Sequence, residues 1–148
     1  MSARDPLIDT SYLESLLGYN ARRASLVIIE QFVREMAEFD LRPVDFSVLS
    51  VIHHNPGVTS RQLCAALAIL PPNLVGLVRR LEKRGLIQRQ PHPQDGRAVG
   101  LYPTESGRIL MQQAEARATA LERRVAQSLS EQEQDQLIGL LQRVYLAP

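Results

Sequence analysis

Apolar positions repeat at helical spacing along most of the chain, and the longest such run lies near its beginning. From about Ser11 to Phe39 an apolar side chain recurs every three or four residues, which predicts one long helix. The repeating positions are Leu13, Leu17, Ala24, Ile28, Phe32, Met36 and Phe39. Val27, Ile29 and Val33 widen this stripe until the helix is apolar on more than one side. Such a helix needs more than one packing partner, which indicates an oligomer.

Three shorter helices follow, each marked by a start or a stop signal. Pro43 suits the first turn of a helix that ends at the Asn-Pro-Gly run over 55–57. Thr59 and Gln62 form a capping box that opens the next helix, over 59–68. A further helix is predicted from 71 to 84, beginning on two prolines and stopped by Gly85.

The pattern then changes to short strands before helical spacing returns. Residues 86–90 and 99–102 are predicted strands, separated by a turn-rich hairpin loop over 91–98. A helix is predicted from about Thr104 to Ser128, and a second capping box, Ser130 with Glu133, opens the last helix. The predicted fold is mainly α with a small β-hairpin, and residues 1–148 form a single module.

Composition places the chain among folded proteins without a disulfide framework. The hydrophobic share of 45% is ordinary for a folded domain, and the single cysteine, Cys64, excludes an internal disulfide. No apolar run approaches the roughly 18–20 residues that a bilayer span requires. The first residues lack the apolar core of a signal peptide. We therefore expect a cytoplasmic protein with no membrane association.

Charge is distributed unevenly, although the net charge is only +1. Residues 56–101 contain seven basic and two acidic side chains, a net charge of +5. The remainder contains ten basic and fourteen acidic side chains, a net charge of −4. A basic centre of this kind is what phosphate binding requires, although basic surface stretches also occur by chance in helical proteins.

The helix predicted over 71–84 has two contrasting faces. Its buried stripe consists of Leu74, Leu77, Val78 and Leu81. The opposite side and its flanks carry Pro72, Asn73, Gly76, Arg79, Arg80 and Lys83. A cationic face around a residue without a side chain can approach bases in a major groove closely. The alternative is a solvated face with an incidental glycine.

The neighbours of this helix favour the first interpretation. A capped helix over 59–68, a short connection and a cationic helix together make a helix-turn-helix. The hairpin that follows would be a wing, and Arg97 near its tip could enter the minor groove.

Three motifs give the chain a resemblance to a known family. They are Leu-Glu-Lys-Arg-Gly-Leu over 81–86, Asp-Gly-Arg over 95–97 and Thr-Glu-Ser-Gly over 104–107. Together they resemble the MarR family of bacterial transcription regulators, over about residues 16–146. Gly96 and Gly100 depart from the family pattern, in which larger residues are common.

The resemblance implies a homodimer that binds double-stranded DNA at a pseudo-palindromic operator. Residues 8–40 and 104–148 would form the dimerisation helices, and 43–103 the winged helix-turn-helix lobe. Asp95 would brace the wing by pairing with nearby arginines. The residues implied in DNA binding are Ser60, Arg61, Gln62, Pro71, Pro72, Asn73, Val75, Gly76, Arg79, Arg80, Lys83, Asp95 and Arg97.

Members of this family often bind small aromatic carboxylates or acyl compounds between the dimer helices and the DNA lobe. The resemblance therefore implies a repressor that a small ligand releases from DNA. Candidate ligand-binding residues are Tyr19, Arg22, Arg23, Phe46 and His53, for which packing and surface charge are the alternative interpretation.

Other kinds of site find less support. His53 and His54 are adjacent and so point about 100° apart on a helix, and no metal-ligand spacing accompanies them, so we expect no metal and no cofactor. Cys64 fits a buried structural thiol. No nucleophile–base pair or phosphate loop indicates an enzyme. The remaining alternative is a winged-helix protein-interaction module or a non-specific architectural DNA-binding module.

Overall fold

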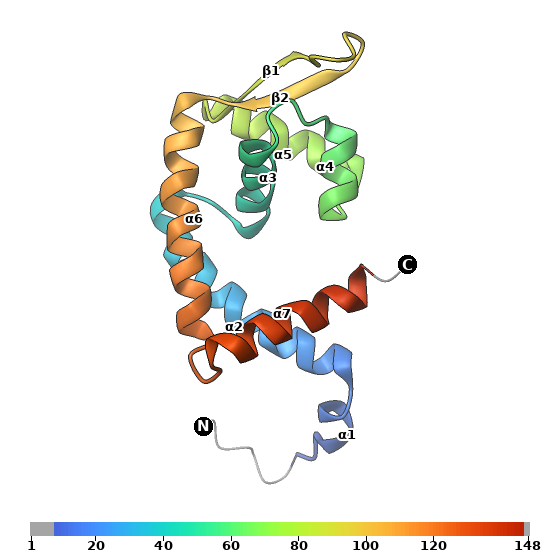
Figure 1. Ribbon diagram of the computed structural model, residues 1–148, viewed down its shortest axis with the longest axis vertical. Helices are drawn as coiled ribbons and strands as arrows, with labels where there is room; N and C mark the ends of the chain where they lie inside the picture. Colours follow the sequence, from blue (N-terminus) through green and yellow to red (C-terminus); the bar gives the residue numbers. More distant parts are fainter. Residues whose placement is uncertain (1–7, 147–148) are drawn as a thin grey trace.

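The computed structural model describes residues 8–146, which form nine helices or strands and one 3-10 turn. These are α1 (Ser11–Glu14), α2 (Leu17–Met36), a 3-10 turn η1 (Ala37–Phe39), α3 (Pro43–His54), α4 (Ser60–Leu67), α5 (Pro71–Lys83), β1 (Ile87–Pro91), β2 (Val99–Pro103), α6 (Glu105–Val125) and α7 (Glu131–Tyr145). In Figure 1, α3, α4, α5 and the β1–β2 hairpin gather at one end, whereas α1 and α7 lie at the other. The long helix α6 runs between the two ends beside α2.

The prediction of one unbroken helix over 11–39 is wrong, because polar side chains break it near residue 15. The backbone N–H and the hydroxyl of Ser15 both donate to the Tyr12 carbonyl, at 3.1 and 2.6 Å. Leu16 is extended, and its carbonyl accepts a hydrogen bond from the Asn20 side chain at 2.8 Å. These local bonds compete with continuation of the helix, which restarts as α2. At the far end Asp40 adopts a left-handed conformation and terminates η1.

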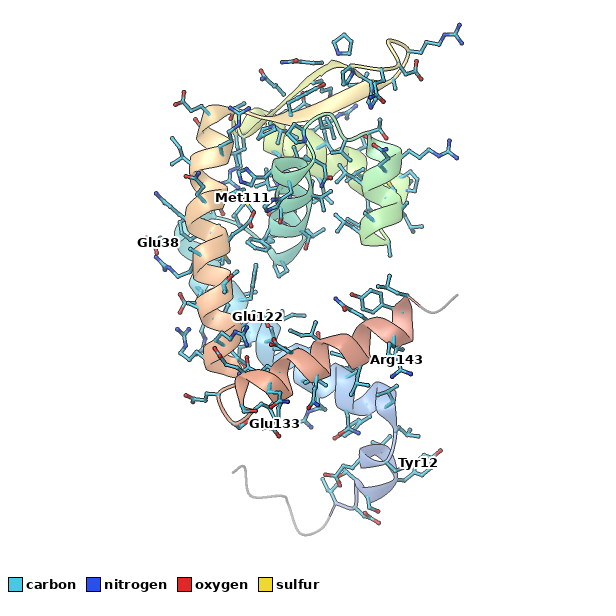
Figure 2. All side chains as sticks on the ribbon, in the orientation of Figure 1. Tyr12, Glu38, Met111, Glu122, Glu133 and Arg143 are labelled. Carbon is cyan, nitrogen blue, oxygen red and sulfur yellow. The ribbon has the colours of Figure 1, made fainter. Side chains whose placement is uncertain are left out.

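The buried core lies mainly within the lobe and along the side of α6 that faces it. The predicted stripe of α5 is confirmed: Leu74, Leu77, Val78 and Leu81 are all buried. They join fully buried residues of α3 and β2, such as Ile52 and Leu101. Met111 contributes from the side of α6 that faces α3 (Figure 2). Its 1% exposure shows that α6 is part of this core as well as a connection.

α4 and α5 form the predicted helix-turn-helix. Thr59 and Gln62 make the predicted capping box, with the Gln62 N–H donating to Thr59 Oγ1 at 3.2 Å and the Thr59 N–H to Gln62 Oε1 at 3.0 Å. Ala68 takes a left-handed conformation that ends α4. The chain then bends by 114° into α5, within the range of helix-turn-helix motifs. No single helix within residues 8–146 is long and apolar enough to span a membrane. Only α4 and α5 counted together, with the bend between them, reach that length and apolarity.

The first hairpin strand lies one residue later than predicted, at 87–91, and the second begins at residue 99 as predicted but ends one residue later, at 103. They pair antiparallel, with Ile87 opposite Pro103 and Pro91 opposite Val99. A bridge between Val58 and Leu101 ties β2 to the segment before α4. At this bridge a side chain on Gly100 would press against the backbone of Gly57, which explains why a small residue occupies a wing position where the family has larger ones.

The Thr-Glu-Ser-Gly motif joins the lobe to α6. The Thr104 hydroxyl donates to the Gly85 carbonyl at 2.6 Å and accepts from the Gly107 N–H at 3.1 Å, capping α6. A methyl group on Gly107 would overlap the carbonyl oxygen of Leu86, so only glycine permits this close approach. α6 ends at Val125, three residues before the predicted boundary, and the predicted Ser130–Glu133 capping box opens α7.

Candidate nucleic-acid interface

The outward face of α5 presents the residues predicted from the sequence. Its exposed residues are Pro71, Pro72, Asn73, Val75, Gly76, Arg79 and Lys83. Nothing lies within 4 Å of the position a Cβ on Gly76 would take, so no packing requirement inside the protein explains this glycine. Because glycine weakens a helix interior by about 1 kcal/mol relative to alanine, close approach by an external partner remains its best explanation.

Arg80 differs from these residues because its guanidinium has a partner within the lobe, although its side chain is 39% exposed. It forms an ion pair with Asp45, a carboxylate of α3 that is only 2% exposed. Asp45 Oδ2 also accepts the backbone N–H of Arg42 at 3.0 Å and lies 3.3 Å from Arg42 Nε. The cation that the sequence assigned to the DNA-facing flank therefore fastens α5 to the first turn of α3.

The environment of Asp45 favours its ionised form. Burial alone would raise the pKa of this carboxyl, but the Arg42 N–H and the guanidinium groups of Arg42 and Arg80 outweigh burial and lower the pKa. A lowered folded-state pKa means that the carboxylate stabilises the fold above the unfolded-state pKa, near pH 4. That stabilisation is lost as the pH falls through the folded-state pKa.

Two more basic residues of the central stretch also have partners within the protein. Arg84 donates to the backbone carbonyls of Asp40 and Phe39, at 2.6 and 2.9 Å. Arg89 forms a 2.8 Å ion pair with Glu82. The charge count of the sequence thus overstates the cations available to a polyanion.

The four remaining cations are free of internal partners. Arg61 at the start of α4, Arg79 and Lys83 on α5, and Arg97 in the wing are exposed. Within residues 8–146 none of their side chains takes part in a hydrogen bond or an ion pair. Ser60 and Gln62 lie beside Arg61, and Gln62 uses its side-chain oxygen in the capping box. These residues combine a helix-turn-helix surface with a cation on an adjacent hairpin.

The wing is braced in a different way from that expected. Asp95 Oδ1 accepts the backbone N–H of Arg97 at 3.0 Å, and no arginine pairs with Asp95 among the described residues. His92 Nδ1 accepts from the N–H groups of Gln94 and Asp95, at 3.2 Å each. The loop is therefore ordered by bonds to its own backbone, which leaves the Arg97 guanidinium exposed for an external partner.

A second feature is an apolar groove where α2, α3, α6 and α7 meet. Its volume is about 570 Å³. Phe32 and Phe46, whose rings meet edge to face at 5.1 Å, line one side, and Leu137, Ile138 and Leu141 of α7 line another. Glu115, Arg123 and Gln134 add polar groups. We call this feature the interhelical groove.

The predicted ligand residues are only partly gathered at this groove. Phe46 lines it, whereas Tyr19, Arg22, Arg23 and His53 do not. Tyr19 and Arg23 contact each other on α2, with Arg23 Nη1 3.2 Å from the Tyr19 hydroxyl. The α7 residues of the groove were missed as ligand candidates.

Cys64 is half-buried against the core, in keeping with a structural thiol. Cys64 is not among the residues that line the interhelical groove.

Comparison with known proteins agrees with this geometry. Residues 39–98 match a family model described as the MarR family. A putative transcriptional regulatory protein for the hcr operon of Thauera aromatica is 32% identical over 130 residues, which cover 87% of this chain and 78% of that protein.

Two solved structures match nearly the whole chain. The transcriptional repressor CouR bound to a 23-mer DNA duplex is 34% identical, with 93% of this chain and 98% of that one covered and a TM-score of 0.86. CouR from Rhodococcus jostii RHA1 bound to p-coumaroyl-CoA is 28% identical, with 92% and 96% covered and a TM-score of 0.84.

The chain belongs to the MarR family. It is a DNA-binding transcriptional regulator with a winged helix-turn-helix, and it is not an enzyme. The alternative of a protein-interaction module is therefore set aside.

We predict that Asp45→Asn lowers the free energy of unfolding by about 2 kcal/mol at pH 7, because a charge-assisted network loses its anion. Urea unfolding at equal protein concentrations measures this loss. The difference from the wild type should shrink below about pH 4, where Asp45 of the unfolded chain is protonated, and disappear once the pH passes the lower folded-state pKa.

Asp135→Asn is the matched control for this substitution. Asp135 is 67% exposed and lies 3.7 Å from Arg123, so its loss should change stability by less than about 0.5 kcal/mol. Equal losses in the two variants at pH 7 would show that Asp45 has no special role in holding α5.

Proposed function

We propose that this chain is a homodimeric repressor that a small acyl compound releases from DNA. The observation that carries the DNA-binding part is the division of the central cations. Three of them have internal partners, and the four free ones lie on α4, α5 and the wing. CouR, which is similar over nearly the whole chain, binds a DNA duplex.

The proposed dimer is supported by apolar side chains left exposed at the end opposite the lobe. α1, α2 and α7 carry them in number, and a monomer in water rarely exposes so many together. They include Tyr12 (75% exposed), Leu17 (63%), Val27 (53%), Val33 (50%), Ile138 (52%), Leu140 (56%), Val144 (59%) and Tyr145 (70%). A second copy of the same helices would cover these side chains with equally apolar ones.

On DNA, the outward face of α5 would enter the major groove with its N-terminal residues nearest the bases. Pro71, Pro72, Asn73 and Val75 would meet base edges or adjoining phosphates, and Gly76 would let the helix backbone approach closely. Ser60, Arg61 and Gln62 would contact the DNA backbone. Two such lobes related by a two-fold axis would meet half-sites roughly 34–36 Å apart, so the operator should be a pseudo-palindrome.

Arg97 would extend from the wing into the minor groove, and Asp95 would order the wing loop that carries it. Arg79 and Lys83 would contact phosphates, while Arg80 would act by orienting α5 through Asp45. This assignment separates cations that bind DNA from those that shape the lobe.

Arg97→Ala should weaken operator binding about tenfold or more, because each dimer loses two desolvated cationic contacts. Fluorescence anisotropy with a labelled operator duplex at constant salt measures the change. Arg89→Ala removes the same charge from the same hairpin, but Arg89 is paired with Glu82, so its affinity should stay within about threefold of the wild type. If Arg97→Ala and Arg89→Ala bind the operator with equal affinity, the proposed contact between Arg97 and the minor groove is refuted.

We infer that the interhelical groove receives the acyl part of an aromatic acyl thioester. Its volume of about 570 Å³ suits a small aromatic group, and Phe32 and Phe46 provide ring surfaces against which that group can pack. CouR has been solved with p-coumaroyl-CoA bound. Because the groove lies between α3 of the lobe and helices α2 and α7, its occupant would favour a particular lobe spacing and so change DNA affinity.

Thermal unfolding with p-coumaroyl-CoA, with free coenzyme A as the control, tests this inference. The thioester should raise the melting temperature and release the operator, and Phe46→Leu should weaken its binding about fivefold through loss of the aromatic contact. Tyr19→Phe distinguishes the groove from the α2 surface assigned by sequence. If Tyr19→Phe weakens binding of the thioester and Phe46→Leu does not, the effector binds outside the groove.

A further inference from the structure

A cluster of metal-ligating side chains lies where α3 meets α6. His53 and His54 occupy the last turn of α3, and Glu115 lies on α6, 61 residues after His54. One ligand atom from each of the three residues falls within 4.8 Å of the other two. Two imidazoles and a carboxylate are a donor set that suits zinc and related transition metal ions.

His54 and Glu115 already lie at a separation that a shared ion would need. The Nε2 atom of His54 is 3.0 and 2.9 Å from the two carboxylate oxygens of Glu115. Two donors on one tetrahedral zinc, each about 2.0–2.1 Å from the ion, lie about 3.3 Å apart. A zinc ion could therefore replace the proton between these groups after a shift of a few tenths of an ångström.

His53 adds an independent observation. Its Nδ1 atom is buried and has no hydrogen-bond partner within the described residues. Its ring packs edge to face against that of His54, with the centroids 5.0 Å apart. A buried ring nitrogen without a partner is energetically unfavourable, and bonding to a ligand of any kind would relieve that cost.

The surroundings of the cluster leave room for an ion to enter from solvent. The His54 side chain is 59% exposed, and that of Glu115 is 30% exposed, so the site opens to solvent on one side. Adjacent histidines on a helix do not normally converge, but Glu115 approaches from a different element and supplies the third donor. Sequence spacing could not indicate this cluster, because Glu115 lies 61 residues after His54.

We propose that His53, His54 and Glu115 bind a divalent transition metal ion, zinc in the first place, which fastens α3 of the DNA-binding lobe to α6. Three protein ligands leave a fourth position for water. Glu115 also lines the interhelical groove, so the ion would lie at the border of that groove and would limit the movement of α3 against α6. This site does not depend on the identity of the effector.

The test uses the full-length chain without an affinity tag, treated with EDTA and desalted, and zinc chloride alone as the probe. Isothermal titration should give one zinc ion per chain. At a hundredfold excess over Kd, zinc should raise the melting temperature by about 5 °C or more. Glu115→Gln and His54→Gln should each weaken zinc binding at least tenfold, because loss of a group that merely hydrogen-bonds a metal ligand already costs about that much.

Glu122→Gln is the matched control. Glu122 lies seven residues further along α6 (Figure 2) and loses the same charge in this variant, so its zinc affinity should equal that of the wild type. His92→Gln, in the wing, controls for the third histidine of the chain. Circular dichroism of the metal-free variants verifies that each is folded. Absence of stoichiometric zinc binding by the wild type, or wild-type affinity in Glu115→Gln, overturns the proposal.

Discussion

The recognition surface of this protein depends on one buried carboxylate. Asp45 cannot remain ionised in the lobe without cations and N–H donors, and it obtains them from Arg42, which caps the start of its own helix, and Arg80 on α5. The apolar stripe of α5 brings that helix against the core, but apolar packing is not directional. The Asp45–Arg80 contact is directional, so it selects one rotation of α5. In that rotation Arg79 and Lys83 face solvent.

The same logic separates structural from functional charge throughout the lobe. Arg84 satisfies carbonyl groups at the end of η1, and Arg89 neutralises Glu82 beside the wing. Each internal pairing orders a junction between elements. Only the cations without such partners are available for phosphates, and their positions on α4, α5 and the hairpin match the grooves that a winged helix-turn-helix meets. The contacts of Thr104 and Gly107 join the lobe to α6, which extends to the far end of the molecule.

Much of the fold could be predicted from the sequence, because its signals are local. The caps at Thr59 and Ser130, the stop at Gly85 and the buried stripe of α5 depend on residues within one or two helical turns. The break near Ser15 was missed because apolar spacing continues through it, whereas the bonds that cause it involve polar atoms.

The sequence predicted which residues of α5 and the wing are exposed, but not which of the central cations have internal partners. The partner of Arg80 lies 35 residues away, and that of Arg84 lies 44 residues away. Glu115 is equally remote from the histidines of α3. Charge counts and spacing rules cannot show such pairs, because only the packed fold brings them together. The groove residues of α7 were missed for the same reason.

The salt dependence of operator binding tests the central claim most directly. If the four free cations of each protomer in the proposed dimer neutralise DNA charge, about eight counterions are released, and log Kobs should fall against log salt with a slope of about −7. If all seven basic residues of the central stretch bound DNA, the slope would be about −13. Affinities measured between about 50 and 200 mM salt distinguish the two. A slope near −13, or no salt dependence, would contradict the division between cations that shape the lobe and cations that bind DNA.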